Sequence, residues 1–205
     1  MLASRPRLLI TADDYGYSPE YNRGILEAAE SGAIDAAGAM VTRAWCDPRP
    51  LLATGVEVGL HLEAAGGVEV QLEAFTRLFG RPPQFVDGHH HCHADPGLEE
   101  EVIDAALGLG ARVRSIDDAQ RRRLRDAGVT TPDRLIGRLA AEEPALPDEV
   151  AAVERGAAPP PGLTEWMTHP GRADPGLGSA YDEEREADLE LLLRLAEAEP
   201  VAAWR

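Results

Sequence analysis

The stretch RLLITADDYGYSPEYNRGI, residues 7–25, decides the fold. Its first six residues, 7–12, form an apolar run that predicts a buried β-strand ending at Asp13 and Asp14. Ser18 is followed by a proline and a glutamate, and this order predicts a helix that begins just after the serine. A strand that leads directly into a helix is the basic unit of an α/β protein with parallel strands.

The same strand-then-helix unit recurs along the rest of the chain. Further strands are expected at residues 33–41, 57–62, 84–87, 111–115, 163–168 and 201–204. Helices are expected at residues 19–31, 72–79, 95–109, 117–127, 148–155 and 182–198. Roughly six or seven such units, with no break in composition, predict one domain over residues 1–205. Its parallel sheet either closes into a barrel or is doubly wound.

The charge composition excludes several classes of enzyme and binding partner before any motif is considered. The 205 residues include 36 acidic and 20 cationic side chains, all 20 of them Arg, so that the formal charge is −16. The absence of lysine excludes Schiff-base and pyridoxal-phosphate enzymes and the lysine of phosphate-binding P-loops. The net charge repels nucleic acids, and the basic run at residues 121–125 is interpreted as a solvated helix face.

Nothing in the sequence indicates a membrane or a secreted setting. Two cysteines, Cys46 and Cys92, are too few for a disulfide framework. No apolar run approaches about 18 residues, the length of a membrane span, and the first residues lack the apolar core of a signal peptide. We therefore expect a cytoplasmic protein.

The reactive side chains gather at the C-terminal ends of the expected strands, where parallel α/β proteins place their sites. Asp13 and Asp14 follow the first strand, His61 closes the third, and His169 follows a late strand. The tract Asp87-Gly88-His89-His90-His91-Cys92-His93 follows the fourth, so all six histidines lie at or just past a strand end. Two adjacent carboxylates repel each other and favour a bound cation or a shared proton.

The histidine tract predicts a metal site. In an extended backbone His89, His91 and His93 face one way while His90 and Cys92 face the other, and we expect the odd-numbered set to line the pocket. A carboxylate with two imidazoles suits Zn²⁺ and also accepts Mg²⁺, Mn²⁺, Fe²⁺ or Co²⁺. Three protein ligands leave coordination positions for water and substrate, which is typical of a catalytic site. A surface metal scavenger is the alternative interpretation of the tract.

Four motifs in register resemble one family. They are LITADDYG at residues 9–16 with NRGILEA at 22–28, VGLHL at 58–62, FGRPPQFVDGHHHCH at 79–93, and THPG at 168–171 followed by Arg185 and Leu189. They run in order over nearly the whole chain and are similar to the YdjC-like carbohydrate deacetylases, which include the chitooligosaccharide deacetylases. The resemblance implies an α/β fold, a (β/α) barrel that is incomplete or seven-stranded. It also places the active site at the C-terminal ends of the parallel strands.

The same resemblance implies a metal-dependent hydrolase that removes the acetyl group from an N-acetylated sugar or oligosaccharide. Asp14, His61 and His89 would hold the metal, Asp13 would act as the general base, and His169 would protonate the departing amine. The cofactor implied is one divalent metal ion, Mg²⁺ or Zn²⁺ first, with Mn²⁺, Co²⁺ or Fe²⁺ as alternatives.

The substrate contacts are expected from Arg114, His91 and His93. The expected partner is a small carbohydrate, with a homodimer left open and neither nucleic acid nor a membrane involved. Only 27 residues separate His61 from His89, a shorter segment than the family carries, so the substrate cleft is expected to differ in shape.

Two other functions fit the same residues. A phosphoesterase or another amidohydrolase would keep the metal, with Arg114 and Arg172 as candidate cations for a phosphate. A non-catalytic metal-binding protein would rely on the histidine tract and would keep its metal after loss of His61. The pair Asp13 and Asp14 favours catalysis, because a metal buffer has no need for a base.

Overall fold

The structure is a computed structural model that describes residues 5–137, 148–177, 179, 181–196 and 204. Its strands are β1 (Pro6–Tyr15), β2 (Ala36–Ala39), β3 (Glu57–Leu62), β4 (Phe85–Gly88), β5 (Arg112–Val113), β6 (Arg134–Ile136) and β7 (Gly162–Thr168). Its α-helices are α1 (Pro19–Glu30), α2 (Pro48–Thr54), α3 (Val68–Phe79), α4 (Glu99–Leu109), α5 (Asp118–Asp126), α6 (Asp148–Glu154) and α7 (Asp182–Ala196). A 3₁₀ helix, η1 (His89–Ala94), follows β4.

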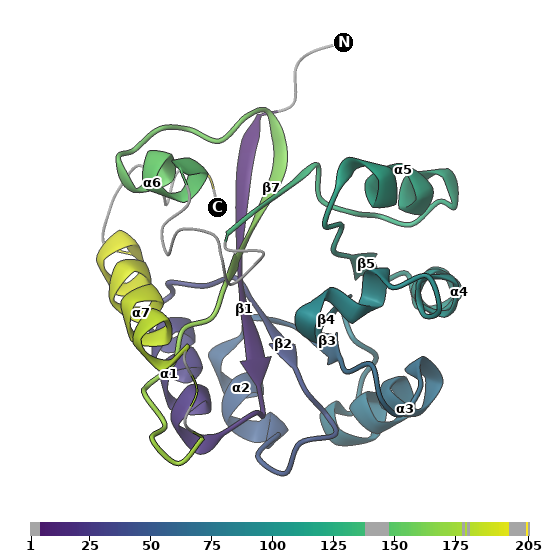
Figure 1. Ribbon diagram of the computed structural model, residues 1–205, viewed down its shortest axis with the longest axis horizontal. Helices are drawn as coiled ribbons and strands as arrows, with labels where there is room; N and C mark the ends of the chain where they lie inside the picture. The colour runs from purple at the N-terminus through teal and green to yellow at the C-terminus, as the bar shows by residue number, and fades with distance from the viewer. Residues whose placement is uncertain (1–4, 138–147, 178, 180, 197–203, 205) are drawn as a thin grey trace.

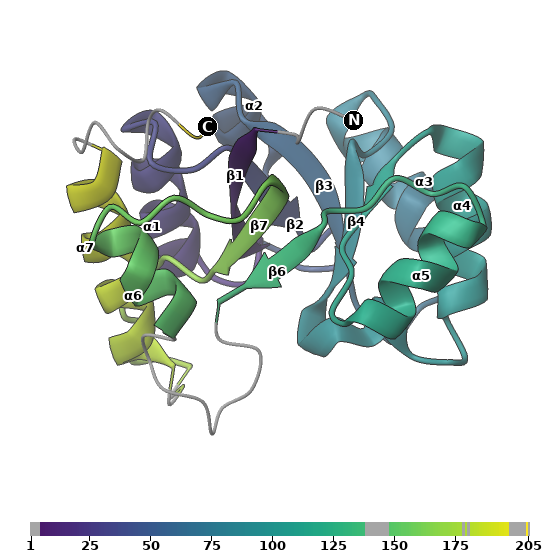
Figure 2. The same ribbon diagram turned by 90° about the horizontal axis from the view of Figure 1, so that it is seen from above.

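The strands of the described residues form one parallel sheet in the order β5-β4-β3-β2-β1-β7-β6. The sheet curls into a half-barrel with the helices arranged around its outside, as Figure 1 and Figure 2 show. β5 and β6 are the two edges of this curl, and no pairing joins them in the described part of the chain. The expectation of an incomplete (β/α) barrel is confirmed, and the doubly wound alternative is wrong.

β1 is an interior strand of the sheet. It pairs with β2 on one side and with β7 on the other, and its pairing with β7 runs unbroken from Pro6 opposite Gly162 to Ala12 opposite Thr168. A strand with neighbours on both sides and both faces covered is a near-continuous apolar run. This burial is why residues 7–12 predict the strand so clearly.

α1 begins where the sequence predicts it. The side chain of Ser18 accepts a hydrogen bond from the backbone N–H of Tyr21 at 3.2 Å and so caps the helix. The buried face of α1 includes Gly24, which touches the loop that follows β7: a Cβ at Gly24 would lie 2.5 Å from Cα of Gly171. This close approach seats the loop that carries His169 against α1.

Two elements were missed by the sequence patterns because they are short. α2 follows Asp47, which caps it by accepting a hydrogen bond from the backbone N–H of Arg49, but seven residues are too few for a helical period to stand out. β6 has three residues, with Arg134 exposed and Ile136 buried, and shows no recognisable alternation. The strand expected at residues 33–41 is confined to the four residues of β2.

Several predicted boundaries also change. The helix expected from residue 95 begins at Glu99, and its expected apolar face is only partly buried, because Val102 is 1% exposed and Leu109 42%. Most of the strand expected at 201–204, and the last two residues of the helix expected at 182–198, lie outside the described residues. None of the described helices combines the length and apolar character that crossing a membrane requires.

Gly24→Ala is expected to destabilise the protein although alanine favours helices. The added methyl group meets the backbone of Gly171, and overpacking of this kind costs about 1–3 kcal/mol. Gly108→Ala is the matched control, because Gly108 also lies in a helix, α4, but has no atom within 4 Å of an added Cβ; this variant gains up to ~1 kcal/mol of helix propensity. Denaturant unfolding measures both changes, and equal shifts in stability would contradict the close packing of α1 on the loop after β7.

Candidate active site

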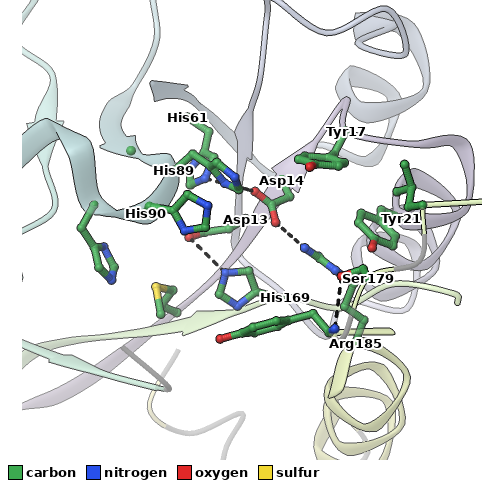
Figure 3. A pocket seen from close by; sticks show the side chains of 15 residues that line it. Asp13, Asp14, Tyr17, Tyr21, His61, His89, His90, His169, Ser179 and Arg185 are labelled. Atoms are coloured by element: carbon green, nitrogen blue, oxygen red, sulfur yellow. Dashed lines mark hydrogen bonds and ion pairs between the residues drawn. The ribbon is translucent and has the colours of Figure 1, made fainter. Parts of the chain in front are cut away.

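Six of the side chains expected to carry chemistry surround one cavity at the C-terminal ends of the strands: Asp13, Asp14, His61, His89, His91 and His169. The cavity has a volume of about 500 Å³. Its lining comes from both ends of the chain: Asp13, Asp14, Tyr17, Tyr21, His61, Gly88, His89, His90, His91, Met167, His169, Leu177, Ser179, Tyr181 and Arg185. Figure 3 shows Asp14, His61 and His89 gathered at one side of the cavity, with His169 facing them.

A bulge at the end of β1 turns two neighbouring carboxylates into this cavity. In a regular strand, adjacent side chains point to opposite faces. The register between β1 and β2 shifts between Ala12 and Tyr15, and Asp14 has a left-handed backbone with a φ of 72°. Such a backbone is strained for a residue with a side chain, and strain of this kind concentrates at functional sites. Asp13 and Asp14 consequently both line the cavity, and each is 1% exposed.

Asp14, His61 and His89 form a compact group, named the Asp14 cluster here. Nδ1 of His89 lies 2.9 Å from Oδ1 of Asp14, and Nε2 of His61 lies 3.3 Å from the same oxygen. The candidate ligand atoms of the three residues all lie within 4.8 Å of one another. The structure thus brings together the three residues that the family resemblance implies as metal ligands.

Asp87 orients His61. The two residues are opposite each other in the register of β3 and β4, and Oδ1 of Asp87 lies 2.8 Å from Nδ1 of His61. This contact leaves Nε2 of His61 facing Asp14. A carboxylate behind a metal-binding imidazole fixes the ring and raises its basicity.

The charge around the Asp14 cluster fits a divalent cation. Burial alone would lower the pKa of His61, but the carboxylates of Asp87, Asp13 and Asp14 raise it well above 6.5. Burial alone would raise the pKa of Asp14, but its contacts with the two imidazoles and the charge of Arg185 hold it well below 3.8. The cluster therefore favours positive charge, and one carboxylate with two imidazoles is a donor set that Zn²⁺ and other borderline divalent ions accept.

A second group of candidate ligand atoms, from Asp13, His61 and Asp87, does not fit a cation. The guanidinium of Arg114 already occupies this place. Its Nη1 and Nη2 donate to the two oxygens of Asp13 at 2.6 and 2.8 Å, and Nη2 lies 2.8 Å from Oδ2 of Asp87. A permanent positive charge between the two carboxylates disfavours a metal ion there.

Arg114 lies beneath the cavity and not on its wall. It is 1% exposed, and its three nitrogens contact carboxylates on β1, β4 and β7. The expectation that Arg114 contacts substrate is therefore not met, because its side chain runs inward across the half-barrel. In this position it fixes both oxygens of Asp13.

Glu165 of β7 is a buried partner of Arg114 that the sequence patterns did not single out. Its Oε1 accepts a hydrogen bond from Nε of Arg114 at 2.9 Å, and the residue is 3% exposed. Burial raises the pKa of Glu165, and Arg114 offsets only part of the rise. A lone acid inside an otherwise apolar parallel strand was the available signal, because such a strand has no solvated face and a buried charge needs a partner.

Arg185 of α7 holds the second oxygen of Asp14. Its Nη2 donates to Oδ2 of Asp14, and its guanidinium lies 3.8 Å from the centroid of the Tyr21 ring. Arg185 lines the cavity and is 5% exposed. In the sequence analysis Arg185 belonged to the last motif but had no assigned role. The sequence of α7 is rich in charged residues, and nothing in that sequence marks one of them as buried.

His169 faces Asp13 across the cavity. Nε2 of His169 lies 4.0 Å from Oδ2 of Asp13, and its backbone N–H donates to Oδ2 of Asp188 at 2.8 Å. Burial lowers the pKa of His169 by more than the carboxylates of Asp13 and Asp14 raise it. A protonated His169 therefore gives up its proton readily.

The histidine tract is not extended, so the expected alternation along it is wrong. It forms η1, in which His90 and His91 have left-handed backbones with φ of 51° and 58°. His89, His90 and His91 consequently all line the cavity. His93 is fully buried, with Nε2 at 3.2 Å from a backbone carbonyl after β5, so its expected substrate contact is not met.

Sequence comparisons connect the chain to named deacetylases. A chitooligosaccharide deacetylase of Serratia marcescens is 27% identical, over 90% of this chain and 90% of its own. A carbohydrate deacetylase of Brevibacillus brevis is 26% identical, over 91% of this chain and 90% of its own. The human carbohydrate deacetylase is 29% identical over 55% of this chain and 49% of its own, so the chain matches about half the length of that relative.

Solved structures share the fold. A protein of Enterococcus faecalis V583, described as a candidate for cellobiose-phosphate cleavage, superposes with a TM-score of 0.76 at 20% identity and covers 98% of this chain and 94% of its own. The peptidoglycan deacetylase PdaC of Bacillus subtilis superposes with a TM-score of 0.51 at 14% identity, over 94% of this chain and 84% of its own. At these identities the likeness concerns the fold alone.

The family model named YdjC-like protein matches residues 7–69 and 63–199. The two matches overlap at residues 63–69, between His61 and His89. Together they span nearly the whole chain, including both aspartates of β1 and the motif that contains His169. The chain belongs to the YdjC-like protein family.

Proposed function

We propose that the chain is a metal-dependent hydrolase that removes the acetyl group from an N-acetylated sugar or oligosaccharide. The observation that carries the proposal is the Asp14 cluster, which shares one cavity with Asp13 and His169. A set of metal ligands with a separate base and a separate acid is what hydrolysis of an amide needs. The relatives named as carbohydrate and chitooligosaccharide deacetylases support the substrate class.

Asp14, His61 and His89 are the proposed ligands of one divalent metal ion. When bound, such an ion polarises the acetyl carbonyl and makes water more acidic. Asp87 and Arg185 keep the ligand atoms in place through the contacts described above. We favour Zn²⁺ or Mg²⁺, with Mn²⁺, Co²⁺ and Fe²⁺ as alternatives for this donor set.

Asp13 is the proposed general base. Burial alone would raise its pKa, but Arg114 and His61 lower it well below its ordinary value, so the carboxylate is ionised at neutral pH. Arg114 holds both carboxylate oxygens and thereby fixes their direction. The attacking water gives one proton to Asp13 while its oxygen bonds to the acetyl carbon.

His169 is the proposed general acid. As the bond between the acetyl carbon and the sugar nitrogen breaks, Nε2 of His169 gives a proton to the departing amine. Because the lowered pKa leaves His169 neutral at neutral pH, the proton that it gives is the one that Asp13 takes from water, passed across the 4.0 Å that separates the two side chains. Acetic acid and a free amino sugar are the products. Each turnover thus consumes one water and leaves both side chains in their starting states.

The two alternatives have less support. For a phosphoesterase, Arg172 is already paired with Glu27 on α1 at 2.7 Å, and Arg114 is buried beneath the cavity. For a metal buffer built on the tract, only His89 of the tract belongs to the Asp14 cluster. We also propose a cytoplasmic location, supported by two cysteines that are both free and buried.

Asp13→Asn is expected to lower deacetylation by about 10²–10⁴-fold, because it removes the base. The assay is acetate release from N-acetylglucosamine oligomers by protein supplied with a divalent metal. Asp104→Asn, at an exposed position of α4, is the control for the loss of one negative charge. Near wild-type activity in Asp13→Asn would contradict its role as the base.

The Asp14 cluster, and not the histidine tract, is expected to determine metal affinity. Asp87→Asn should weaken Zn²⁺ binding about 10–100-fold by freeing the ring of His61, and His61→Ala should weaken it further by removing a ligand. His90→Ala is the matched control, because His90 lines the cavity outside the cluster. Titration calorimetry measures the three affinities, and a loss in His90→Ala as large as that in His61→Ala would contradict the assignment.

A further inference from the structure

A second groove lies outside the catalytic cavity, between α1 and the segment that leads into α2. Its volume is about 560 Å³, within the range of about 300–1,000 Å³ that ligand pockets occupy. It is lined by Tyr15, Pro19, Asn22, Arg23, Leu26, Glu27, Glu30, Trp45, Asp47 and Pro50, none of which lines the catalytic cavity. We name it the Trp45 groove.

Trp45 is exposed where other aromatic side chains are buried. It is 55% exposed, whereas Tyr15 and Tyr21 are each 1% exposed and Phe75 is fully buried. An exposed indole adds little to the core, and it offers a large, rigid apolar surface with a polar N–H at its edge. Such a side chain beside a groove indicates a binding surface.

The backbone of Trp45 is fixed to the strand that carries the catalytic residues. Nδ2 of Asn22 donates to the carbonyl of Trp45 at 2.8 Å, and Oδ1 of Asn22 accepts from the backbone N–H of Gly16 at 2.6 Å. The backbone N–H of Asp47 also donates to the Trp45 carbonyl, at 2.9 Å. A side chain on a backbone held in this way loses little freedom when a ligand binds.

The loop that carries Trp45 also connects its groove to the catalytic cavity. Arg43 precedes Trp45 by two residues, and its guanidinium lies 4.7 Å from the centroid of the Tyr17 ring. Tyr17 lines the catalytic cavity. Arg43 is held in turn by an ion pair with Glu63. The cavity and the groove therefore approach each other at the loop that follows β2, through the contact between Arg43 and Tyr17.

We propose that the Trp45 groove binds a further sugar unit of an oligosaccharide whose N-acetylated unit lies in the catalytic cavity. This inference rests on the proposed function and adds to it a second contact site for an oligosaccharide. A pyranose ring has a face of C–H groups that packs on an aromatic ring, and its hydroxyl groups need hydrogen-bond partners. Trp45 provides the aromatic surface, and Arg23 and Glu30 provide a donor and an acceptor beside it.

The charge of the groove selects among sugars. Three acids, Glu27, Glu30 and Asp47, and one cation, Arg23, line it, on a chain whose formal charge is −16. Glu27 and Asp47 are ion-paired with Arg172 and Arg49, and Arg23 is ion-paired with Glu20. These charges largely cancel, so the groove offers an anionic ligand no net attraction. A neutral or amino sugar is therefore the ligand that fits.

The test compares Trp45→Ala and Trp45→Phe in the metal-loaded protein. Their kcat/KM is measured by acetate release from N-acetylglucosamine oligomers of two and four units. Trp45→Ala is expected to lower kcat/KM about tenfold for the tetramer and by less than about twofold for the dimer, because only the tetramer is long enough to reach the indole. Trp45→Phe is expected to keep most of the activity, because it keeps an aromatic ring. Val70→Ala is the control at another exposed apolar residue, 63% exposed on α3.

Equal losses for both lengths, or no loss for the tetramer, would overturn the proposal. Sedimentation of the wild type and Trp45→Ala tests the rival occupant, a second copy of the chain. A dimer that dissociates in Trp45→Ala would show that the groove is a subunit interface, and would likewise overturn the proposal.

A binding measurement separates this inference from the proposed function. Titration calorimetry with the glucosamine tetramer, which has no acetyl group, should show binding that weakens about tenfold in Trp45→Ala and is unchanged in Val70→Ala. Binding of this kind without acetate release from any oligomer would support the groove and contradict the deacetylase. Acetate release without any effect of Trp45 on either assay would leave the deacetylase standing and overturn the groove.

Discussion

One buried guanidinium determines how the rest of this structure is arranged. Arg114 follows the edge strand β5 and reaches carboxylates on β4, β1 and β7, so that it spans the interior of a sheet whose described strands form a half-barrel. Removing these charges from water is costly, and the arrangement is favourable only when geometry and hydrogen bonding compensate every group. The bidentate contact with Asp13 meets that condition. Strand pairing sets the register of the half-barrel, and the Arg114 side chain adds a contact across its interior between β5 and β7.

The catalytic geometry is an extension of the same network. Asp87 contacts both Arg114 and His61, His61 contacts Asp14, and Asp14 contacts Arg185 on the last described helix. Each member orients the next, and loss of one partner leaves a buried charge uncompensated. The residues that orient the proposed metal ligands are thus also residues on which folding depends, which limits how far either property can be changed alone.

Sequence patterns predicted what depends on burial and position along a strand. The apolar runs marked the buried strands, and their ends located Asp14, His61 and His89, because parallel strands bring their C-terminal ends to one edge. The directions in which the side chains point could not be predicted from these patterns. The prediction that the histidine tract is extended was wrong, because the left-handed backbones in η1 depend on tertiary packing. The prediction that Arg114 contacts substrate failed because its partners lie on three other strands. Glu165 was detectable only as an acid in an apolar strand.

The position of β1 between β2 and β7 has a consequence for synthesis of the chain. β1 is the first of these strands to leave the ribosome, and its neighbour β7 is the last. Until β7 arrives, one side of β1 presents unpaired backbone groups, the kind of edge that pairs with other chains and aggregates. Contacts between distant segments also slow folding. A nascent chain of this protein therefore remains exposed to misassembly, and in need of shielding by chaperones, until its C-terminal quarter has been made.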